Sequence, residues 1–438
     1  MMARGKKKES TLTPEEKLAQ ALVPAEEQPY KVPENWCWVW LPVTFENHTD
    51  SKKKVQQKTY LEDGRVSVVD QGQELIGGYT DDTSMLYSGE LPVVIFGDHT
   101  RCIKYIDFPF AQGADGVKVL KPKAFYSPKA FYYSLQAVDI PNMGYRRHFP
   151  LFDQYAMPVP PPVEQQRIVD RIEYLFAKLD EAKEKAQSVL DSFETRKAAI
   201  LHKAFTGELT AKWRAEHGVV KSTWATNMVG EFAEVKGGKR LPKGHVLTTE
   251  KTDHPYLRIA DFGEGTIDQS DLHYITNETY AEISRYIITS EDVYLSIVGS
   301  IGKTGVIPKE LDGANLTENA ARIISQCTLP KYLCAYLSSP TTQDDIQGRI
   351  RSATLGKLSL LNIKDISVLI PTKEEQAEII RILDSLFAKE QQAKEAAEAV
   401  LEKIDLLKKS ILARAFRGEL GTNDPTEESA LELLKSVL

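Results

Sequence analysis

Apolar and polar positions follow two different patterns along this 438-residue chain, and the change between them separates helical from globular segments. In residues 160–209 and 371–420, apolar side chains recur in steps of four and three, and Lys and Glu crowd the positions between them. This spacing is typical of the a/d seam of a coiled coil. Each segment predicts a helix of about 40 residues, roughly 60 Å long. The predicted seam consists of Ile168, Ile172, Leu175, Leu179, Ala182, Ala186, Val189, Phe193 and Ile200, and of Ile379, Leu383, Leu386, Ala393, Ala397, Val400, Ile404, Leu407 and Ile411.

The two helical segments are copies of one another. A shift of 211 positions aligns 160–209 with 371–420 without a gap, and 22 of the 50 pairs are identical. Both copies end in one phrase, AFTGEL and AFRGEL, in which Gly207 and Gly418 stand where a left-handed C-terminal cap belongs. Prolines precede both copies, and Thr372 with Glu375 has the spacing of a capping box. The chain therefore contains a long internal repeat.

The order of the segments predicts how the two helices pair. A single charged heptad helix is most often an oligomerisation coiled coil, but two near-identical helices in one chain can pack against each other. The order is globule, helix, globule, helix. A second helix that starts at the second globule therefore runs back towards the first, so the pair is antiparallel. We expect approximate two-fold symmetry, with two globules held apart and the C-terminus returned to the N-terminus.

The segments between the helices follow a different pattern. Residues 30–159 and 222–370 mix short β-rich runs with Gly-rich turns and a few short helices, and they do not match each other in sequence. We predict an α+β fold, with two α/β globules separated by an antiparallel pair of long coiled-coil helices. The predicted domains are an N-terminal extension with a short helix (1–29), the first globule (30–159), the first long helix (160–212), a linker (213–221), the second globule (222–370), the second long helix (371–420) and a C-terminal tail with a short helix (421–438).

Composition narrows the class of protein. At 42% hydrophobic and 27% charged residues, the chain is ordinary for soluble globular protein. No apolar run approaches 18 residues, and the start, MMARGKKKES, lacks the apolar core of a signal peptide. Cys37, Cys102, Cys327 and Cys334 show neither CxxC spacing nor a neighbouring His pair. We expect a cytoplasmic chain without a metal site or a disulfide framework.

The catalytic motifs in the globules are incomplete. The run 299–305 ends like a phosphate-binding P-loop, but Ile297 stands where GxxxxGK[ST] requires glycine. His99 and His148 have charged neighbours, yet no Ser or Cys stands in a nucleophile elbow. No GxGxxG follows a strand, and there is no Asn-Pro-Pro-Tyr-like tetrapeptide. The sequence predicts a protein that is not an enzyme.

The ordered set of motifs resembles one family, the specificity (S) subunits of type I restriction-modification systems, and the resemblance covers nearly the whole chain. It rests on the repeated helices with Glu-Gln near each start and Ala-Phe-x-Gly-Glu-Leu at each end, on the continuation Leu209-Thr210-x-x-Trp213-Arg214, and on the entry VPENW at 32–36. Within the globules, GDHTR at 97–101 with GYRRHF at 144–149, and YLRIAD at 256–261 with GSIGKTG at 299–305, are similar to segments of that family's target recognition domains.

The resemblance implies a non-catalytic subunit that recognises DNA sequence. Each globule would read one half of an asymmetric, bipartite target, and the helices would set the unread spacer and dock methyltransferase subunits. The implied partners are double-stranded DNA, two modification subunits that carry S-adenosylmethionine for adenine-N6 methylation, and restriction subunits that use ATP and Mg. The chain itself would hold no cofactor and contact no membrane. Two alternatives stay open: a coiled-coil adaptor without DNA specificity, and an enzyme of unrecognised type.

The net charge of the chain does not by itself support a DNA-binding role. The chain carries −7, and Lys+Arg minus Asp+Glu is 14 − 15 = −1 for residues 30–159 and 15 − 18 = −3 for residues 222–370, whereas nucleic-acid binders are usually basic. Basic residues nonetheless cluster, and Arg, Lys and Asn suit phosphate contact or base reading. The candidate DNA-binding residues are Lys52, Lys53, Lys54, Lys58, Arg101, Arg146, Arg147, Lys236, Lys239, Arg240, Arg258, Lys303, Asn319, Arg349 and Arg351.

Overall fold

The structure is a computed structural model, and it describes residues 13–351 and 356–437. The chain forms two compact units, Met1–Ala186 with Ala399–Leu438 and Gln187–Glu398. Each unit combines one globule of strands and short helices with one stretch of paired helices. The predicted α+β class is therefore confirmed.

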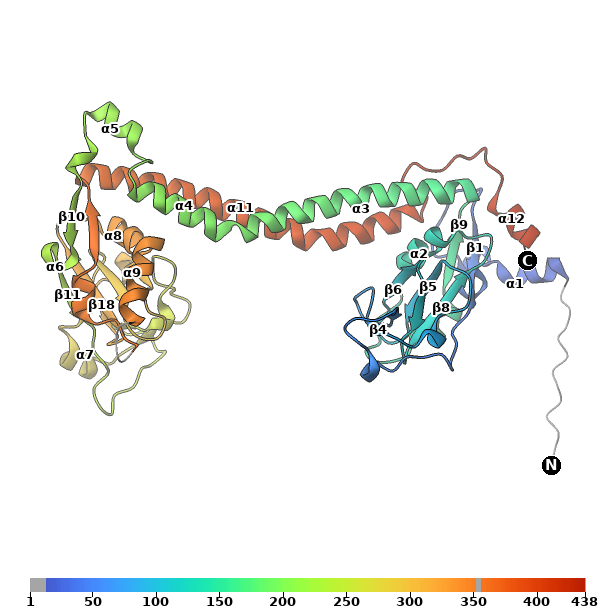
Figure 1. Cartoon of the computed structure of the whole chain (residues 1–438), viewed down its shortest axis with the longest axis horizontal. Helices are drawn as coiled ribbons and strands as arrows, with labels where there is room; N and C mark the ends of the chain where they lie inside the picture. Colours follow the sequence, from blue (N-terminus) through green and yellow to red (C-terminus); the bar gives the residue numbers. More distant parts are fainter. Residues whose placement is uncertain (1–12, 352–355, 438) are drawn as a thin grey trace. The chain divides into compact units, whose positions relative to one another are not determined.

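The globule of the first unit contains three small sheets (Figure 1). Its first and last strands, β1 and β9, pair antiparallel, so the two ends of the globule meet. The four-stranded sheet has the order β2-β8-β5-β6, the three-stranded sheet has the order β4-β3-β7, and α2 packs on β5, β6 and β8. The elements are β1 (Cys37–Trp40), β2 (Phe45–Asn47), β3 (Val66–Val69), β4 (Gly78–Thr80), β5 (Val93–Gly97), β6 (Ile103–Ile106), β7 (Phe110–Gln112), β8 (Val117–Pro122), α2 (Pro128–Ala137) and β9 (Ala156–Val159).

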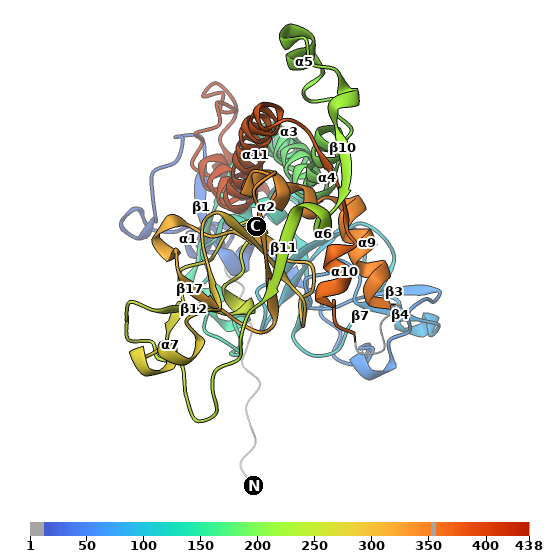
Figure 2. The same cartoon turned by 90° about the vertical axis from the view of Figure 1, so that its left-hand side faces the viewer.

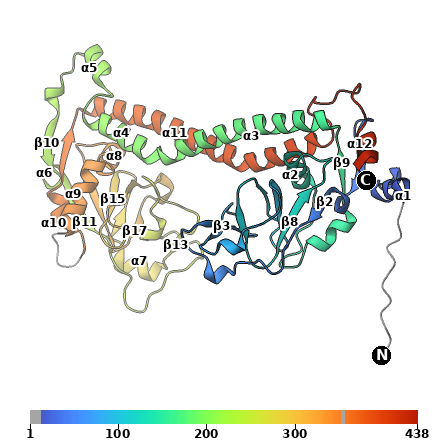
Figure 3. The same cartoon turned by 45° about the vertical axis from the view of Figure 1, so that its right-hand side comes forward.

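The globule of the second unit also contains three sheets, and Figure 2 turns it towards the viewer. They are β10-β19, β11-β18-β15-β16 and β13-β12-β17-β14, and α8 packs against β15 and β16 (Figure 3). The strands are β10 (Ala225–Met228), β11 (Ala233–Gly237), β12 (Pro255–Leu257), β13 (His273–Tyr274), β14 (Ile287–Ile288), β15 (Asp292–Ser296), β16 (Thr304–Val306), β17 (Ala314–Leu316), β18 (Ala320–Ser325) and β19 (Ser367–Ile370). The helices are α6 (Val229–Phe232), α7 (Asn277–Ile283), α8 (Pro330–Leu337), α9 (Pro340–Arg351) and α10 (Leu360–Lys364).

The two globules share one topology, although their sequences do not match. In both, the first and last strands pair, a four-stranded sheet is antiparallel throughout, and another sheet contains a parallel pair, β3 with β7 and β12 with β17. The match extends to single hydrogen bonds at the end of the central strand. The N–H of Asp98 donates to the carbonyl of Gly116, and that of Ile297 to the carbonyl of Asn319. The globules are therefore two versions of one fold.

Each unit also holds a pair of antiparallel helices. In the first unit α3 (Pro162–Asp191) packs along the end of α11 (Lys373–Ala415), and in the second unit α4 (Phe193–Phe205) packs along its beginning (Figure 1). Asp180 pairs with Lys408 at 2.6 Å, and Arg196 pairs with Glu390 at 2.7 Å. Residue numbers therefore rise along one helix as they fall along the other, which confirms the antiparallel pairing.

The first long helix differs from its prediction, because it is interrupted at Ser192 between α3 and α4. The Ser192 hydroxyl donates to the carbonyl of Ser188 at 2.6 Å, and the Arg196 guanidinium donates to the carbonyl of Val189 at 3.1 Å. Side chains that take main-chain carbonyls compete with the helical N–H groups, which explains a local break. The second copy has Lys403 at the position of Ser192, and α11 continues without interruption over 43 residues.

The predicted seam is buried or half-buried except at three positions of α11, where it is wrong. Ala393 is exposed, and Val400 and Leu407 are 40% and 48% exposed. Lys408 faces α3 in place of Leu407, with its ammonium 5.2 Å from the centre of the Phe176 ring. Because the lysine stem covers apolar surface while its ammonium pairs with a carboxylate, the neighbouring leucine points to solvent.

Short helices lie at both ends of the chain and contact each other (Figure 1). The first, α1 (Pro14–Ala21), begins with a capping box in which Thr13 and Glu16 bond each other's main-chain N–H. The second, α12 (Ala430–Val437), packs against the same hydrophobic cluster as α1 through Leu433 and Leu434. A further short helix, α5 (Ala211–His217), follows the first copy of the repeat.

A tryptophan and a glutamate join each globule to its helices. The indole N–H of Trp36 donates to Glu164 at 2.7 Å, and that of Trp224 donates to Glu375 at 2.8 Å. Both carboxylates are completely buried. The neighbouring Gln165 and Gln376 each accept a main-chain N–H from the globule, those of residues 127 and 329. Each copy of the repeated Glu-Gln pair therefore attaches one globule to its helices. The predicted capping box is therefore half formed: the Thr372 hydroxyl accepts the N–H of Glu375 at 3.3 Å, but the Glu375 carboxylate points into this junction instead of back to its own helix start.

The two junctions balance their buried charge differently. Glu375 accepts hydrogen bonds from the guanidinium of Arg214 at 2.6 Å and from the hydroxyl of Thr210 at 2.7 Å. Glu164 instead accepts from the neutral side chains of Thr422, at 3.2 Å, and Asn423, at 2.8 Å. The Trp-Arg continuation after the first helix thus supplies the cation at the junction of the second globule. The junction of the first globule uses neutral donors instead.

Candidate nucleic-acid interface

Several loops of the first globule meet at the C-terminal end of the central strand β5. The turn after β5 receives a hydrogen bond from the 141–148 loop, in which the N–H of His148 donates to the carbonyl of Asp98 at 2.8 Å. The side chain of Gln71 accepts the N–H of His99, and the carbonyl of Gln71 accepts the hydroxyl of Thr100. We call residues 97–102, 113–116 and 141–148 the tip of the first globule.

Three predicted DNA-binding residues meet at this tip. Arg146 and Arg147 are exposed, and within the described part of the chain neither has an ion-pair partner. Arg101 has a different role, because its guanidinium donates to the carbonyl of Ile140 at 2.8 Å. Arg101 therefore positions the 141–148 loop, while the two neighbouring arginines are available for a ligand.

The other predicted cations of the first globule lie between β2 and β3. Lys52 and Lys58 are exposed, Lys54 is half-buried, and the ammonium of Lys53 lies 3.4 Å from the carbonyl of Leu86. This segment joins the tip at Val55, which accepts the N–H of Ala114 at 2.7 Å. It therefore extends the positive surface next to the tip.

Most predicted cations of the second globule already have acidic partners. Lys236 pairs with Glu234 at 2.8 Å and Arg240 with Glu318 at 2.7 Å. Lys239 lies over the ring of Tyr286, at 5.6 Å. These pairs explain how a cluster of basic residues coexists with an acidic globule.

Arg258, a candidate base reader, is committed to the fold. Its guanidinium donates to the buried carboxylate of Asp261 at 2.7 Å and to the carbonyl of Asp271 at 2.7 Å, and it lies 3.3 Å from His273. The hydrogen bond to Asp261 raises the pKa of Arg258 above its ordinary value. The structure thus places Arg258 as a structural residue of the second globule.

Two of the remaining candidates, Lys303 and Asn319, lie at the turn after β15. Lys303 is exposed and donates to the carbonyl of Phe262 at 3.1 Å, and Asn319 is half-exposed beside this turn. Arg349 bonds Asp345 at 2.9 Å and the carbonyl of Asp365 at 2.9 Å. The side chain of Arg351 lies outside the described part of the chain. Lys303 and Asn319 occupy in the second globule the place that the tip occupies in the first.

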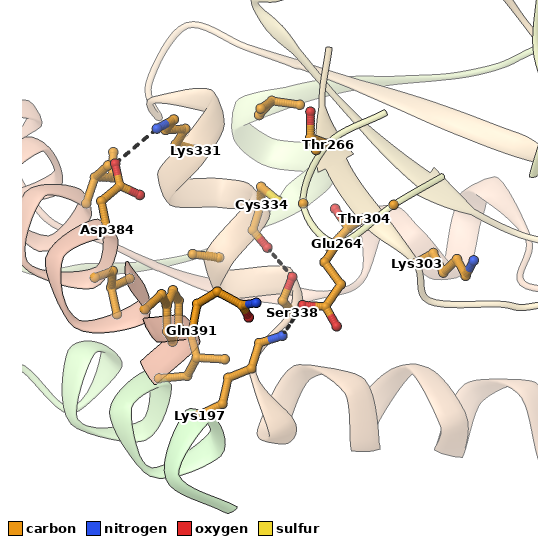
Figure 4. A pocket seen from close by; sticks show the side chains of 18 of the residues that line it. Lys197, Glu264, Thr266, Lys303, Thr304, Lys331, Cys334, Ser338, Asp384 and Gln391 are labelled. Carbon is orange, nitrogen blue, oxygen red and sulfur yellow. Dashed lines mark hydrogen bonds and ion pairs between the residues drawn. The ribbon is translucent and has the colours of Figure 1, made fainter. Parts of the chain in front are cut away.

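A cavity of about 1050 Å³ lies in the second unit between its globule and its helices (Figure 4). Lys197 pairs with Glu264 at 2.7 Å, and Lys331 pairs with Asp384 at 3.0 Å. The hydrogen bond from Lys197 lowers the pKa of Glu264. Burial raises the pKa of Cys334, in the wall of the cavity, to about 11, so its thiol stays protonated at neutral pH. The charges around this cavity neutralise one another, and the cavity offers no activated nucleophile among its described residues.

The sequence analysis missed one residue at the tip. Tyr145 is 85% exposed, and its ring stacks on the imidazole of His99 at a centroid distance of 4.7 Å. The only signal in the sequence was an aromatic residue beside two arginines, and the stack joins residues that are far apart along the chain.

Two searches of the described residues bear on other kinds of site. No helix among them is long and apolar enough to cross a membrane. The same residues contain no group of three or more His, Cys, Asp or Glu that could hold a metal ion.

Comparisons with known proteins point to one family. The model for the type I restriction modification DNA specificity domain matches residues 221–403. The EcoKI specificity subunit of Escherichia coli (strain K12) is 30% identical over 279 residues, which are 61% of this chain and 58% of that subunit. The StySPI specificity subunit of Salmonella potsdam is 24% identical over 433 residues, which are 89% of this chain and 90% of that subunit. The chain is similar to the specificity subunits of type I restriction-modification systems.

The similarity to specificity subunits extends to the fold. The HsdS subunit from Thermoanaerobacter tengcongensis superposes with a TM-score of 0.61 at 17% identity, over 90% of this chain and 99% of that one. The comparisons support the predicted family and the predicted class of a non-catalytic DNA-specificity subunit. Nothing in the comparisons supports the alternative of an adaptor without DNA specificity.

Proposed function

We propose that this chain is the DNA-recognition subunit of a type I restriction-modification complex, and that each globule reads one half of an asymmetric, bipartite target. The duplicated fold of the globules carries this proposal. The turn at the end of the central strand lies beside Arg146 and Arg147 in the first globule, and in the second globule Lys303 and Asn319 lie at the corresponding turn. A shared frame with different polar side chains around the same turn is the arrangement expected of two readers of different sequences.

The partners follow from this role. Two modification subunits carry S-adenosylmethionine and the adenine-N6 chemistry, and restriction subunits supply the steps that need ATP and Mg. The specificity subunit holds no cofactor of its own, and the complex works in the cytoplasm on double-stranded DNA. Flipping of the target adenine falls to the modification subunits.

Exposed apolar side chains on α11 support docking of the modification subunits on the helices. Val400, Leu406 and Leu407 are 40%, 66% and 48% exposed on one helix of the first unit. A two-helix pair covers only part of each helix, and exposed leucines on such a pair are ordinarily covered by further helices. We propose that helices of a modification subunit cover this stretch.

Exchange of one globule tests the two-reader proposal. Residues 30–159 are replaced by the corresponding globule of another specificity subunit that keeps a tryptophan at the position of Trp36. Sequencing of methylated adenines in a host that expresses the system is expected to show one new half-site beside one unchanged half-site. A change in both half-sites would contradict independent reading by the two globules.

Neutral substitution of the lysine cluster tests which residues contact phosphates. In the triple variant Lys52→Gln, Lys53→Gln, Lys54→Gln, we expect cognate and non-cognate DNA to bind more weakly by similar factors. The slope of log K against log salt should become shallower by about 0.9 for each lost phosphate contact. The measurement is binding of the assembled complex at two salt concentrations. Lys236→Gln is the control, because this ammonium is paired with Glu234, and an unchanged slope in the triple variant would exclude phosphate contacts there.

A further inference from the structure

The ring of Tyr145 combines exposure with a fixed position. It is the most exposed large apolar side chain of the described residues, at 85%, whereas apolar side chains of this size are usually at least half-buried. One face of the ring stacks on His99, with an angle of 12° between the ring planes. The other side of the tyrosine is open to solvent. An aromatic ring held on one face and exposed on the other is ready to contact a ligand.

A buried network fixes the loop that carries Tyr145. His148 is completely buried and lies between two main-chain groups, with its Nδ1 2.9 Å from the carbonyl of Asp98 and its Nε2 accepting the N–H of Met143 at 3.1 Å. These two bonds require the neutral imidazole with its proton on Nδ1. The carboxylate of Asp98 accepts the N–H of Phe149 at 2.8 Å. The loop is therefore tied to the β5 turn at both the main chain and the side chains.

Two residues of the tip have a backbone conformation that non-glycine residues rarely adopt. Arg101 has φ +60° and Asp115 has φ +51°, and they lie in the two turns that flank the end of β5. Such conformations are unfavourable and gather at binding sites, where the surrounding structure holds them. The hydrogen bond from Arg101 to the carbonyl of Ile140 links one of these turns to the loop of Tyr145.

The two residues that follow Tyr145 carry the positive charge that binding to DNA phosphates requires. Arg146 and Arg147 follow Tyr145 directly and are exposed. The carboxylate of Asp98 is buried, and its second oxygen lies 4.0 Å from the ammonium of Lys118. An exposed aromatic ring beside unpaired guanidinium groups can pack against bases while the cations bind phosphates or guanine.

The second globule contains the same pair of rings in a different setting. The His254 imidazole stacks on the Tyr280 ring at 3.8 Å with an interplanar angle of 4°. Tyr280 is only half-exposed, and its helix, α7, carries Glu278 and Glu282. A stack of His on Tyr with acidic neighbours does not suit DNA, so this pair serves as a natural control.

We infer that Tyr145 is a specificity-determining residue whose ring packs against bases of the half-site read by the first globule, with Arg146 and Arg147 holding the adjacent DNA. This inference rests on the proposed function, because it names the residues that perform the reading. His99 acts as a positioning residue, since it supports the ring from behind. The ligand is duplex DNA that contains the bipartite target.

The test measures binding of the assembled complex to its own target and to a panel of single-base variants in both half-sites. Tyr145→Ala is expected to lower affinity for the target by about 10- to 100-fold, the loss expected when recognition of one base pair in a duplex site is removed. It should also relax discrimination at one or two adjacent positions of one half-site, with the other half-site unchanged. Tyr145→Phe keeps the ring and should keep the discrimination, and Tyr280→Ala should change neither quantity.

The outcomes separate this inference from the proposed function. If the unaltered complex reads a bipartite target and Tyr145→Ala binds the whole panel as the unaltered complex does, the role of Tyr145 is overturned while the proposed function stands. If the unaltered complex shows no bipartite recognition, the proposed function itself fails. Because Tyr145 is exposed, Tyr145→Ala should melt at the temperature of the unaltered chain, and this measurement accompanies the binding data.

Discussion

Replacing Arg214 by Met is expected to lower the free energy of unfolding of the second unit by about 3–5 kcal/mol, the cost of removing one partner from a buried ion pair. Glu375 is completely buried, the side chain of Arg214 is 10% exposed, and their closest atoms are 2.6 Å apart. Without the guanidinium, Trp224 and Thr210 remain as the only hydrogen-bond donors to this carboxylate among the described residues. Hydrogen exchange of the main-chain amides of α4 and the first half of α11 measures the loss, since both helices belong to this unit.

Two further variants give the Arg214 experiment its controls. Arg167→Met removes a partly exposed pair with Glu427 at the other junction, and it should cost about 0–1 kcal/mol. The double variant Arg214→Met, Glu375→Leu removes both charges, and it should recover part of the loss, because no unpaired charge stays buried but the indole N–H of Trp224 loses its acceptor. A loss in Arg214→Met no greater than that in Arg167→Met would show that the buried charge is not what the arginine stabilises.

Insertion of one heptad into each helical repeat is expected to change the DNA target without changing either half-site. The insertions are placed in antiparallel register, near Ala182 in α3 and near Ile404 in α11. Seven residues keep the seam in phase, because a heptad is two turns at 3.5 residues per turn. They add about 10 Å of helix, which is roughly three base pairs of DNA. The unread spacer should widen, and affinity for the original spacing should fall on the order of 10³-fold because one half-site is lost.

Methylome sequencing and direct binding both measure the effect of the insertion. A heptad in α3 alone puts the two helices out of register, and this control should weaken recognition of both the old and the widened target. An insertion variant that keeps the old spacer and reads an altered half-site would contradict the role of the helices in setting the spacing.

The structure separates predicted DNA-binding residues that are exposed from those that are bonded within the fold. Arg146 and Arg147 are exposed at the tip, as a cluster of basic residues in a loop would indicate. Arg258 belongs to an equally plausible motif, yet Asp261 and Asp271 occupy its donors. Composition cannot separate these cases, because whether an arginine is free depends on which carboxylates the fold brings to it. Tyr145 was missed for the same reason, since its support from His99 exists only after two distant loops meet.

The sequence by itself determined the repeat, the helical period and the antiparallel pairing, because all three follow from spacing and chain order. Apolar positions in steps of three and four allow little besides a helix, and two copies in one chain leave little choice of direction. Only the tertiary structure decided which way each helix face turns, as Lys408 replaces Leu407 in the seam. It alone revealed that the globules share one topology, because strand pairing depends on long-range hydrogen bonds that many sequences can form. It also decided which polar groups are bonded inside the fold and which remain exposed without a partner, since that division depends on neighbours distant in the sequence.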